Sequence, residues 1–362
     1  MKINYRPEID GLRAIAVGVV ILYHAEIYIF GYQPFKGGFI GVDIFLVISG
    51  YLITSIILKE LNETGTFSYK YFYERRIRRI IPALTVVMLA SLPFAWLYLL
   101  PSELIDYSKS ILFSLGFNSN FYFHFSGLEY GTHDGLLKPF LHTWSLSVEE
   151  QYYILFPIIL LITFKYFKKH LFSILTVGIL TSLFIADWGS KNYPSFNFYI
   201  LPTRAWELGI GSLLAYFEIS NKRREQNIFL GKTLPFLGLL LIIHSVVFFD
   251  DNMFHPSFFT LSPIFGVCFI IWFSNKDEII YKILSSKLFV GIGLISYSLY
   301  LWHYPIFAFA RIAEYPQGEA IVRIFIIISL IILSISSYYF VERPARNRIY
   351  DFRKIFIILI SG

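Results

Sequence analysis

The sequence predicts an all-α fold, a polytopic integral membrane helix bundle with about ten transmembrane helices. Hydrophobic residues make up 56% of the 362 residues and charged residues only 15%, whereas soluble domains carry about 25% charged residues. The pattern lacks the alternation that marks strands. Apolar runs long enough to cross a hydrocarbon core of about 30 Å lie at 13–31, 39–58, 79–100, 145–164, 171–187, 202–219, 228–248, 258–274, 288–310 and 320–341.

The distribution of basic residues predicts the orientation of these spans. With the N-terminus in the cytoplasm, 23 of the 31 Lys and Arg fall in cytoplasmic segments and 5 in outer segments, as the positive-inside rule requires. A further apolar stretch, 104–124, would invert every later loop if it crossed. We therefore interpret 101–144 as one external segment with a partly embedded or re-entrant helix.

The chain divides into a membrane domain, 1–354, and an apolar stub, 355–362. The stub is either a short tail or the beginning of an eleventh span. The positive-inside bias accounts for the net charge of +6, so we expect no nucleic-acid partner. A single cysteine, Cys268, excludes an internal disulfide. The external His and Asp residues match no known ligand spacing, so we expect no metal site.

The first apolar segment carries Asp10, Arg13 and His24 on one helical stripe. Arg13 and His24 are eleven positions apart, which is about three turns and 16 Å of an α-helix. A neutral histidine can accept a proton from a hydroxyl, and an arginine can bind a phosphate with two hydrogen bonds. A structural histidine with an interfacial arginine explains the pattern equally well.

Four arginines precede the third span, in the segment YKYFYERRIRRIIP. They are Arg75, Arg76, Arg78 and Arg79. Such a cluster suits a phosphate-rich ligand on the cytoplasmic face, but it also suits anionic lipid headgroups. The residues alone slightly favour the lipid interpretation.

Adjacent carboxylates, Glu149 and Glu150, enter the fourth span close to His142 and Trp144. Neighbours on a helix point about 100° apart, so they do not form a glycosidase-type pair. They either bind an acceptor hydroxyl, act as a base, pair with another helix through Arg204, or cap the helix, as Glu150 would do with Ser147.

Other ionisable residues lie inside spans, where charge is costly. For Asp43 we favour a structural ion pair with Arg13 over a site role. Arg204 and Glu207 are one turn apart and form a self-neutralising pair in the simplest interpretation. His303 shares a stripe with Tyr300 and is equally compatible with a structural and a catalytic role.

Seven ordered blocks resemble the acyltransferase-3 membrane proteins, the O-acetyltransferases of bacterial surface polysaccharides. The blocks extend over nearly the whole chain. They read YRPEIDGLRAIAV, GGFIGVDIFLVISGYLIT, FYERRIRRIIPAL, LHTWSLSVEEQYYILFP, RAWELGIGSLLA, ISYSLYLWHYPI and VERPAR.

The resemblance implies a multi-pass protein of the bacterial inner or plasma membrane. It would take an acyl group, usually acetyl, from cytoplasmic acyl-CoA and deliver it to a cell-surface glycan such as lipopolysaccharide, exopolysaccharide or peptidoglycan. The family's basic-x10-His motif maps onto Arg13 and His24, and its Arg-x-x-Arg motif onto Arg76 and Arg79. Many relatives continue into an external SGNH esterase-like domain, so a separate extracytoplasmic transferase is a candidate partner.

These features predict a mechanism without a permanently bound cofactor and with acetyl-CoA as donor substrate. We expect His24 to act as general base or to carry the acyl group, and Arg13 to orient the donor phosphate or His24. Arg76 and Arg79 would bind CoA with Arg75 and Arg78. Glu149, Glu150 and His303 would line the acceptor side. The competing class is a non-enzymatic transporter of glycans or lipids, which would show no dependence on acyl-CoA.

Overall fold

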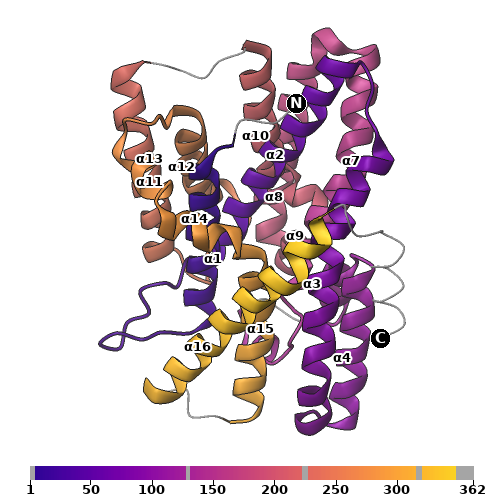
Figure 1. Ribbon diagram of the computed structural model, residues 1–362, viewed down its shortest axis with the longest axis vertical. Helices are drawn as coiled ribbons and strands as arrows, with labels where there is room; N and C mark the ends of the chain where they lie inside the picture. Colours follow the sequence, from indigo (N-terminus) through magenta and orange to yellow (C-terminus); the bar gives the residue numbers. More distant parts are fainter. Residues whose placement is uncertain (1–4, 128–130, 222–226, 315–319, 348–362) are drawn as a thin grey trace. The chain divides into compact units, whose positions relative to one another are not determined.

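The computed structural model describes residues 5–127, 131–221, 227–314 and 320–347 (Figure 1). Within them the regular secondary structure is helical, apart from one isolated bridge between Ile29 and Tyr32. This confirms the all-α expectation. The stub 355–362 lies outside the described residues, as do Lys2, Lys222, Arg223, Arg224, Arg348, Arg353 and Lys354.

The chain forms two compact units. The first comprises residues 1–67 and 145–294, and the second 68–144 and 295–362. Helix α7 begins at the end of a second-unit segment and continues into the first unit. The helices of the first unit are α1 (Pro7–His24), α2 (Gly41–Thr64), α7 (Thr143–Tyr166), α8 (Leu171–Asn192), α9 (Pro194–Tyr199), α10 (Leu201–Asn221), α11 (Ile228–Phe248), α12 (Leu261–Phe273), α13 (Ile279–Leu284) and α14 (Lys287–Leu294).

In the second unit, the long helix α3 is followed by the shorter α4 (Figure 1). The C-terminal part of this unit ends in a π-helical segment, η4, and one further turn. The helices are α3 (Tyr69–Tyr98), α4 (Pro101–Leu115), α5 (Ser119–Phe125), α6 (His133–Leu136), α15 (Ser296–Ile312), α16 (Ala320–Ser337), η4 (Tyr338–Glu342) and α17 (Arg343–Arg346).

Six helical segments in the described part of the chain are long and apolar enough to cross a membrane. They are Gly38–Thr64, Tyr69–Tyr98, Thr143–Tyr166, Lys168–Asn192, Phe229–Phe248 and Ile321–Arg346. The other predicted spans also coincide largely with helices, but α12 has 13 residues and α15 has 17, and α10 carries Arg204 and Glu207. The expected number of ten crossings is therefore not confirmed.

Helix α1 differs in its bounds from the predicted span 13–31. It begins at Pro7 and ends at His24, because proline is favoured in the first turn and the chain then turns through left-handed conformations at Glu26 and Phe30. The apolar stretch after His24 is loop, although its composition resembles the helix. His24 therefore lies at the end of α1 and not deep within a longer helix, as the sequence had suggested.

Close backbone contact joins α2 to α10 within the first unit. A Cβ at Gly50 would lie 1.8 Å from the Leu208 carbonyl oxygen, and one at Gly211 would lie 2.0 Å from the Val47 carbonyl oxygen. Only glycine fits such an approach, which is the usual reason for small residues between membrane helices. This packing places the ionisable residues of both helices next to each other.

Candidate functional site

His24 is buried where α1 meets the loop before α2. Its side chain is 1% exposed, and its ring centroid lies 4.9 Å from that of Tyr23. Tyr23 packs edge-on against Phe39 at 5.9 Å. A Cβ at Gly38 would lie 2.3 Å from the Val19 carbonyl oxygen, so glycine allows this loop to approach α1. The loop thereby encloses the end of α1 that bears His24.

A carboxylate is held beside this end of α1. The Tyr23 hydroxyl donates a 2.6 Å hydrogen bond to Asp251 Oδ1, in the loop after α11. Burial raises the pKa of the Asp251 carboxyl, and the hydrogen bond from Tyr23 opposes this rise. The arrangement fixes the Tyr23 ring and hence one boundary of the His24 environment.

Arg13 is engaged at the other end of the same helix. Its Nη1 donates to Asp10 Oδ1 at 2.8 Å, while the Tyr5 hydroxyl donates to Asp10 Oδ2 at 2.8 Å. Burial and Asp10 raise the pKa of Tyr5 to about 12, so Tyr5 remains a donor. The helical rise separates Arg13 from His24 by about 16 Å, and helical side chains point toward the N-terminus. This geometry disfavours direct orientation of His24 by Arg13.

The expectation of an ion pair between Asp43 and Arg13 is wrong, because Asp43 pairs with Arg204. Arg204 Nη1 lies 2.8 Å from Asp43 Oδ1 and 3.1 Å from Glu207 Oε1. All three residues are fully buried. The expected pairing of Arg204 with Glu207 is present, but the close packing of α2 on α10 adds a second carboxylate.

His255 completes this buried ionic cluster, which comprises Asp43, Arg204, Glu207 and His255. Arg204 Nη1 lies 3.0 Å from His255 Nε2; since a guanidinium only donates, Nε2 accepts. The other ring nitrogen, Nδ1, then donates to Thr260 Oγ1 at 3.2 Å. Burial, together with the charge of Arg204, lowers the pKa of His255 well below its ordinary value. The cluster therefore holds a neutral histidine in a defined tautomer.

The side chains of Glu149 and Glu150, both on α7, have different environments. Glu149 accepts a 2.5 Å hydrogen bond from the Ser49 hydroxyl of α2 and another from the Tyr153 hydroxyl. The Glu150 side chain is buried at 5% exposure. The hydrogen bond from Ser49 means that Glu149 links α7 to α2, and the expected pairing of these carboxylates with Arg204 stays a prediction.

The four arginines of α3 have distinct environments. Arg75 is exposed and stacks over the Tyr71 ring at 4.5 Å, and the half-buried Arg76 lies 5.6 Å from the Phe72 ring. Arg78 is buried; it forms a 2.9 Å ion pair with Glu74 and donates to the Ala345 carbonyl at 3.4 Å. Arg78 thus stabilises the unit, whereas Arg75 and Arg76 remain accessible to a ligand.

A buried carboxylate from the VERPAR block adjoins the basic end of α3. Glu342 is fully buried and accepts hydrogen bonds from the Ser298 hydroxyl and from Arg346. Arg79 is close enough to act electrostatically on both Glu342 and Arg346. The Tyr297 hydroxyl donates to the Ile80 carbonyl at 3.0 Å, which fastens α15 to α3 at the same level.

His303 lies halfway along α15 against His142. The two ring centroids are 5.4 Å apart, and both side chains are almost completely buried. His303 Nδ1 lies 2.6 Å from the Tyr300 carbonyl oxygen, which can only accept. Nδ1 therefore donates, and the neutral ring carries its lone pair on Nε2. The Tyr300 hydroxyl donates to the His142 carbonyl at 2.7 Å and ties the two segments together.

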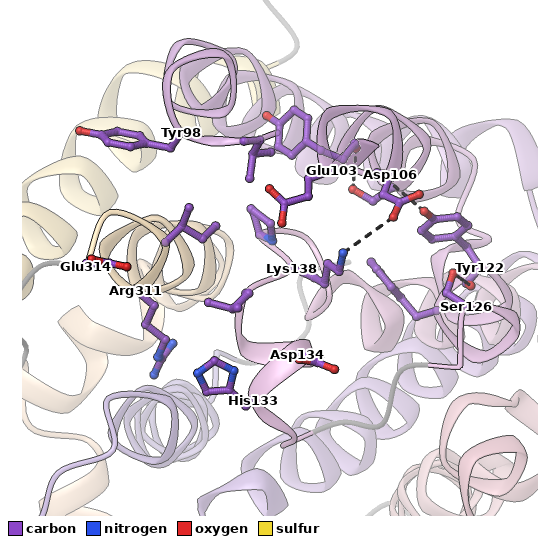
Figure 2. Close-up of a pocket in the computed structure, with 17 residues that line it drawn as sticks. Tyr98, Glu103, Asp106, Tyr122, Ser126, His133, Asp134, Lys138, Arg311 and Glu314 are labelled. Atoms are coloured by element: carbon purple, nitrogen blue, oxygen red, sulfur yellow. Dashed lines mark hydrogen bonds and ion pairs between the residues drawn. The ribbon is translucent and has the colours of Figure 1, made fainter. Parts of the chain in front are cut away.

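A polar cavity of about 670 Å³ opens in the second unit, at the C-terminal ends of α3 and α15 (Figure 2). Figure 2 shows Glu103 and Lys138 pointing into it from different segments. Lys138 Nζ lies 3.8 Å from Asp106 Oδ2. The wall comprises Tyr98, Leu99, Glu103, Asp106, Tyr107, Ser110, Tyr122, Phe123, Ser126, His133, Asp134, Leu137, Lys138, Pro139, Arg311, Ile312 and Glu314.

Sequence reasoning missed His255 and the cavity. His255 is a loop residue that reaches the ionic cluster from far along the chain, so spacing on one helix could not reveal it. The cavity is lined from four separate segments. The one signal available was the unusual polar and aromatic content of the external segment 101–144. Within the described residues, no group of three or more His, Cys, Asp or Glu side chains is placed to hold a metal ion.

Comparison with known proteins identifies the family. Residues 6–340 match the family described as Acyltransferase domain. A Staphylococcus aureus (strain MSSA476) protein named "Putative O-acetyltransferase" is 33% identical over 96% of this chain and 58% of its own length. O-acetyltransferase OatA of Staphylococcus aureus (strain NCTC 8325) is 32% identical over 95% of this chain and 58% of its own.

The chain thus spans about 58% of the length of these curated relatives. No solved structure matches it significantly. The family match covers five of the seven blocks completely, includes the first block from its second residue, and reaches the residue before VERPAR. With this match and its several long apolar helices, the chain is a multi-pass membrane protein that belongs to the acyltransferase family its motifs resemble.

Proposed function

We propose that this protein is a membrane-bound O-acyltransferase that moves an acetyl group from cytoplasmic acetyl-CoA to a hydroxyl of an extracytoplasmic glycan. The observation that carries the proposal is the family match over residues 6–340. Relatives named as O-acetyltransferases support the choice of oxygen as acceptor and acetyl as the group transferred. The family resemblance supports a bacterial plasma membrane as the location, and the bias of basic residues supports a cytoplasmic N-terminus.

The donor site is proposed at the N-terminal end of α3. CoA is polyanionic and needs a basic site on the cytoplasmic face, and arginine binds phosphate with two hydrogen bonds. Arg75 and Arg76 are accessible there, and Arg79 lies one turn further along. Arg78 contributes by fixing this helix through Glu74. Arg13 is assigned to donor phosphate, since its distance from His24 argues against the alternative.

His24 is proposed to handle the proton or the acyl group. As a general base it accepts the proton of the glycan hydroxyl while the oxygen attacks the thioester carbonyl, and the carbon–sulfur bond breaks to release CoA. As a nucleophile it first displaces CoA from the thioester to form an acyl-imidazole; the hydroxyl oxygen then attacks the acyl carbon, the acyl–nitrogen bond breaks, and the imidazole nitrogen takes the hydroxyl proton. His303 is proposed as a second histidine on the acceptor side. Glu149 and Glu150 are proposed to line the acceptor side as well.

The final acceptor is either the glycan itself or a hydroxyl of a separate extracytoplasmic transferase. The second alternative follows from the family resemblance, because many members carry an external SGNH esterase-like domain. In both alternatives the membrane domain carries out the step that consumes acetyl-CoA.

Transfer of label in isolated membranes tests this function. Membranes with the wild-type protein or His24→Ala would receive acetyl-CoA labelled in the acetyl group, together with cell-surface glycan. The proposal predicts labelled glycan with the wild type and at least about a hundredfold less with His24→Ala. Equal labelling would remove His24 from the mechanism. If CoA is neither bound nor consumed, the transporter class replaces the enzyme.

A further inference from the structure

The cavity of the second unit has the size and lining of a ligand site that no motif assigns. Its volume of about 670 Å³ falls within the roughly 300–1,000 Å³ typical of small-molecule sites. Its wall combines aromatic rings with hydrogen-bonding groups of both kinds. Tyr98, Tyr107 and Tyr122 supply the rings, whereas Glu103 and Lys138 supply an acceptor and a donor that point inward (Figure 2).

This combination fits a saccharide. A sugar ring presents apolar C–H faces, which pack on amphipathic aromatic side chains. Its hydroxyls both donate and accept, so carboxylates and an ammonium can bind them together. An apolar ligand would displace water from the charged ends of Glu103 and Lys138 without replacing its hydrogen bonds, at a cost in binding free energy.

The charge of the wall discriminates against an anionic ligand. Four carboxylates face two cations, which gives a formal charge of −2 with His133 neutral. The carboxylates are Glu103, Asp106, Asp134 and Glu314, and the cations are Lys138 and Arg311. Lys138 is also paired with Asp106, which reduces its attraction for an anion. The phosphates of CoA would be repelled here, so the cavity does not suit the donor.

The cavity lies at the opposite end of α3 from the arginine cluster. Arg76 and Tyr98 are separated by about 33 Å of helical rise, close to the 30 Å thickness of a hydrocarbon core. Helix α15 runs beside α3 from the level of Ile80, which Tyr297 contacts, to the cavity, which Arg311 lines. His303 is about 8 Å of rise from Ser298, beside Glu342, and about 12 Å from Arg311 at the cavity. A donor bound at the arginines and a ligand in the cavity would therefore occupy opposite membrane faces.

We propose that this cavity binds an uncharged saccharide, as the acceptor-recognition site on the extracytoplasmic face. The assignment rests on the proposed transfer to a glycan, but its binding step requires no acyl donor. Tyr98 provides a stacking surface and Glu103 a charged hydrogen-bond acceptor. The buried His142 and His303 lie between this cavity and the basic end of the unit, on the path that the acceptor hydroxyl would follow.

Saccharide binding to the purified full chain in lipid nanodiscs tests the assignment without acetyl-CoA. The probes are two trisaccharides of similar size, namely uncharged N,N′,N″-triacetylchitotriose and anionic trigalacturonate. Saturation-transfer NMR would give their dissociation constants. We expect the uncharged probe to bind and the anionic probe to bind at least about tenfold more weakly.

Two variants and two matched controls locate the site. Glu103→Gln retains the acceptor for the Leu100 backbone amide but loses the charge, and should weaken binding about tenfold. Tyr98→Ala should weaken it several-fold. Glu63→Gln and Tyr166→Ala change exposed residues in the other unit and should leave it unchanged. Both cavity variants binding as tightly as wild type, or no binding of any probe, would overturn the assignment.

Acyl transfer provides a separate readout. If saccharide binding fails while acetyl-CoA-dependent labelling of glycan persists, the cavity assignment falls and the proposed function stands. If binding behaves as expected but no acetyl group is transferred, the cavity remains a saccharide site and the proposed function falls.

Discussion

His142 and His303 lie ring to ring inside one helical unit, with centroids 5.4 Å apart and planes inclined by 74°. One residue precedes α7 and the other lies within α15, 161 positions later. The Tyr300 hydroxyl bonds to the His142 carbonyl, and the Tyr300 carbonyl accepts from His303 Nδ1. A single tyrosine therefore fixes the backbone of one histidine and the tautomer of the other.

The fixed tautomer of His303 gives a prediction that distinguishes a role in proton transfer from a purely structural role. His303→Asn can retain a donor to the Tyr300 carbonyl, but it has no basic nitrogen. If His303 transfers a proton, both His303→Asn and His303→Ala should lower kcat about a hundredfold or more. Labelled acetyl-CoA turnover would be measured beside the thermal unfolding midpoint. Wild-type turnover in His303→Asn with a loss only in His303→Ala would mean a purely structural role.

Burial of His142 predicts a loss of stability in acid. Burial, with a contribution from His303, lowers the pKa of His142 well below its ordinary value, whereas in the unfolded chain it titrates near 6.5. The unfolded state consequently binds more protons as the pH falls below about 6.5, and the folded state loses stability. The Tm in detergent should fall between pH 7.5 and pH 5.5.

His142→Phe isolates this contribution, because phenylalanine can stack on Tyr304 as His142 does. The variant should lose less of its Tm over the same pH interval than the wild type. An identical decline in both proteins would assign the acid sensitivity to other groups.

The arginines of α3 should separate into ligand-binding and structural classes. Arg76→Ala should raise the KM for acetyl-CoA while leaving the Tm unchanged, because Arg76 is half-buried and lies over one ring. Arg76→Lys should raise the KM for acetyl-CoA less than Arg76→Ala does, because lysine keeps the charge but cannot form the bidentate hydrogen bonds of arginine. Arg75→Ala should behave like Arg76→Ala. An unchanged KM would favour contact with lipid headgroups.

Arg78→Ala should instead destabilise the protein. It removes a buried ion pair and leaves Glu74 and the Ala345 carbonyl without this donor. The expected loss is on the order of 1–3 kcal/mol in the free energy of unfolding, reduced by the partial exposure of Glu74. A lower Tm with an unchanged KM in the remaining folded protein is the expected pattern, whereas an unchanged Tm would contradict the structural role.

The contact between α2 and α10 predicts opposite effects for two glycine substitutions. Gly50→Ala would place a methyl group 1.8 Å from the Leu208 carbonyl oxygen and should destabilise by about 1–3 kcal/mol or more. Gly18→Ala, in α1, meets nothing within 4 Å and should stabilise slightly, since alanine favours helix. The difference between the two Tm values reports the close contact of α2 with α10 at Gly50. Equal Tm values for the two variants would contradict this contact.

The helical class and most helix positions follow from hydropathy, but helix ends do not. The predicted span 228–248 coincides with α11 (Ile228–Phe248), because its apolar run and its helix have the same limits. The run 13–31 fails at its end, since the residues after His24 are largely apolar yet form a loop in which Tyr28, Ile29 and Phe30 are exposed. The run 288–310 is broken between α14 and α15, just after Gly291 and Gly293 of α14, which weaken the helix.

Pairing across the fold was harder to predict than the existence of charged residues. The sequence indicated Asp43 and Arg204 as buried charges, but not that they contact each other. Their partnership depends on the close approach of α2 and α10 at Gly50 and Gly211, which no periodicity encodes. His24 and Arg13 were identified from their spacing, whereas their separate environments required three-dimensional structure.

The most direct test of transfer across the membrane uses sealed proteoliposomes that contain the full chain in a single orientation. Acetyl-CoA labelled in the acetyl group would be trapped inside, on the side of the α3 arginines, and glycan supplied outside. The account predicts label on the outer glycan with the wild type and a loss of at least about a hundredfold with His24→Ala. Labelling only when donor and acceptor share one compartment, or labelling unaffected by His24→Ala, would contradict it.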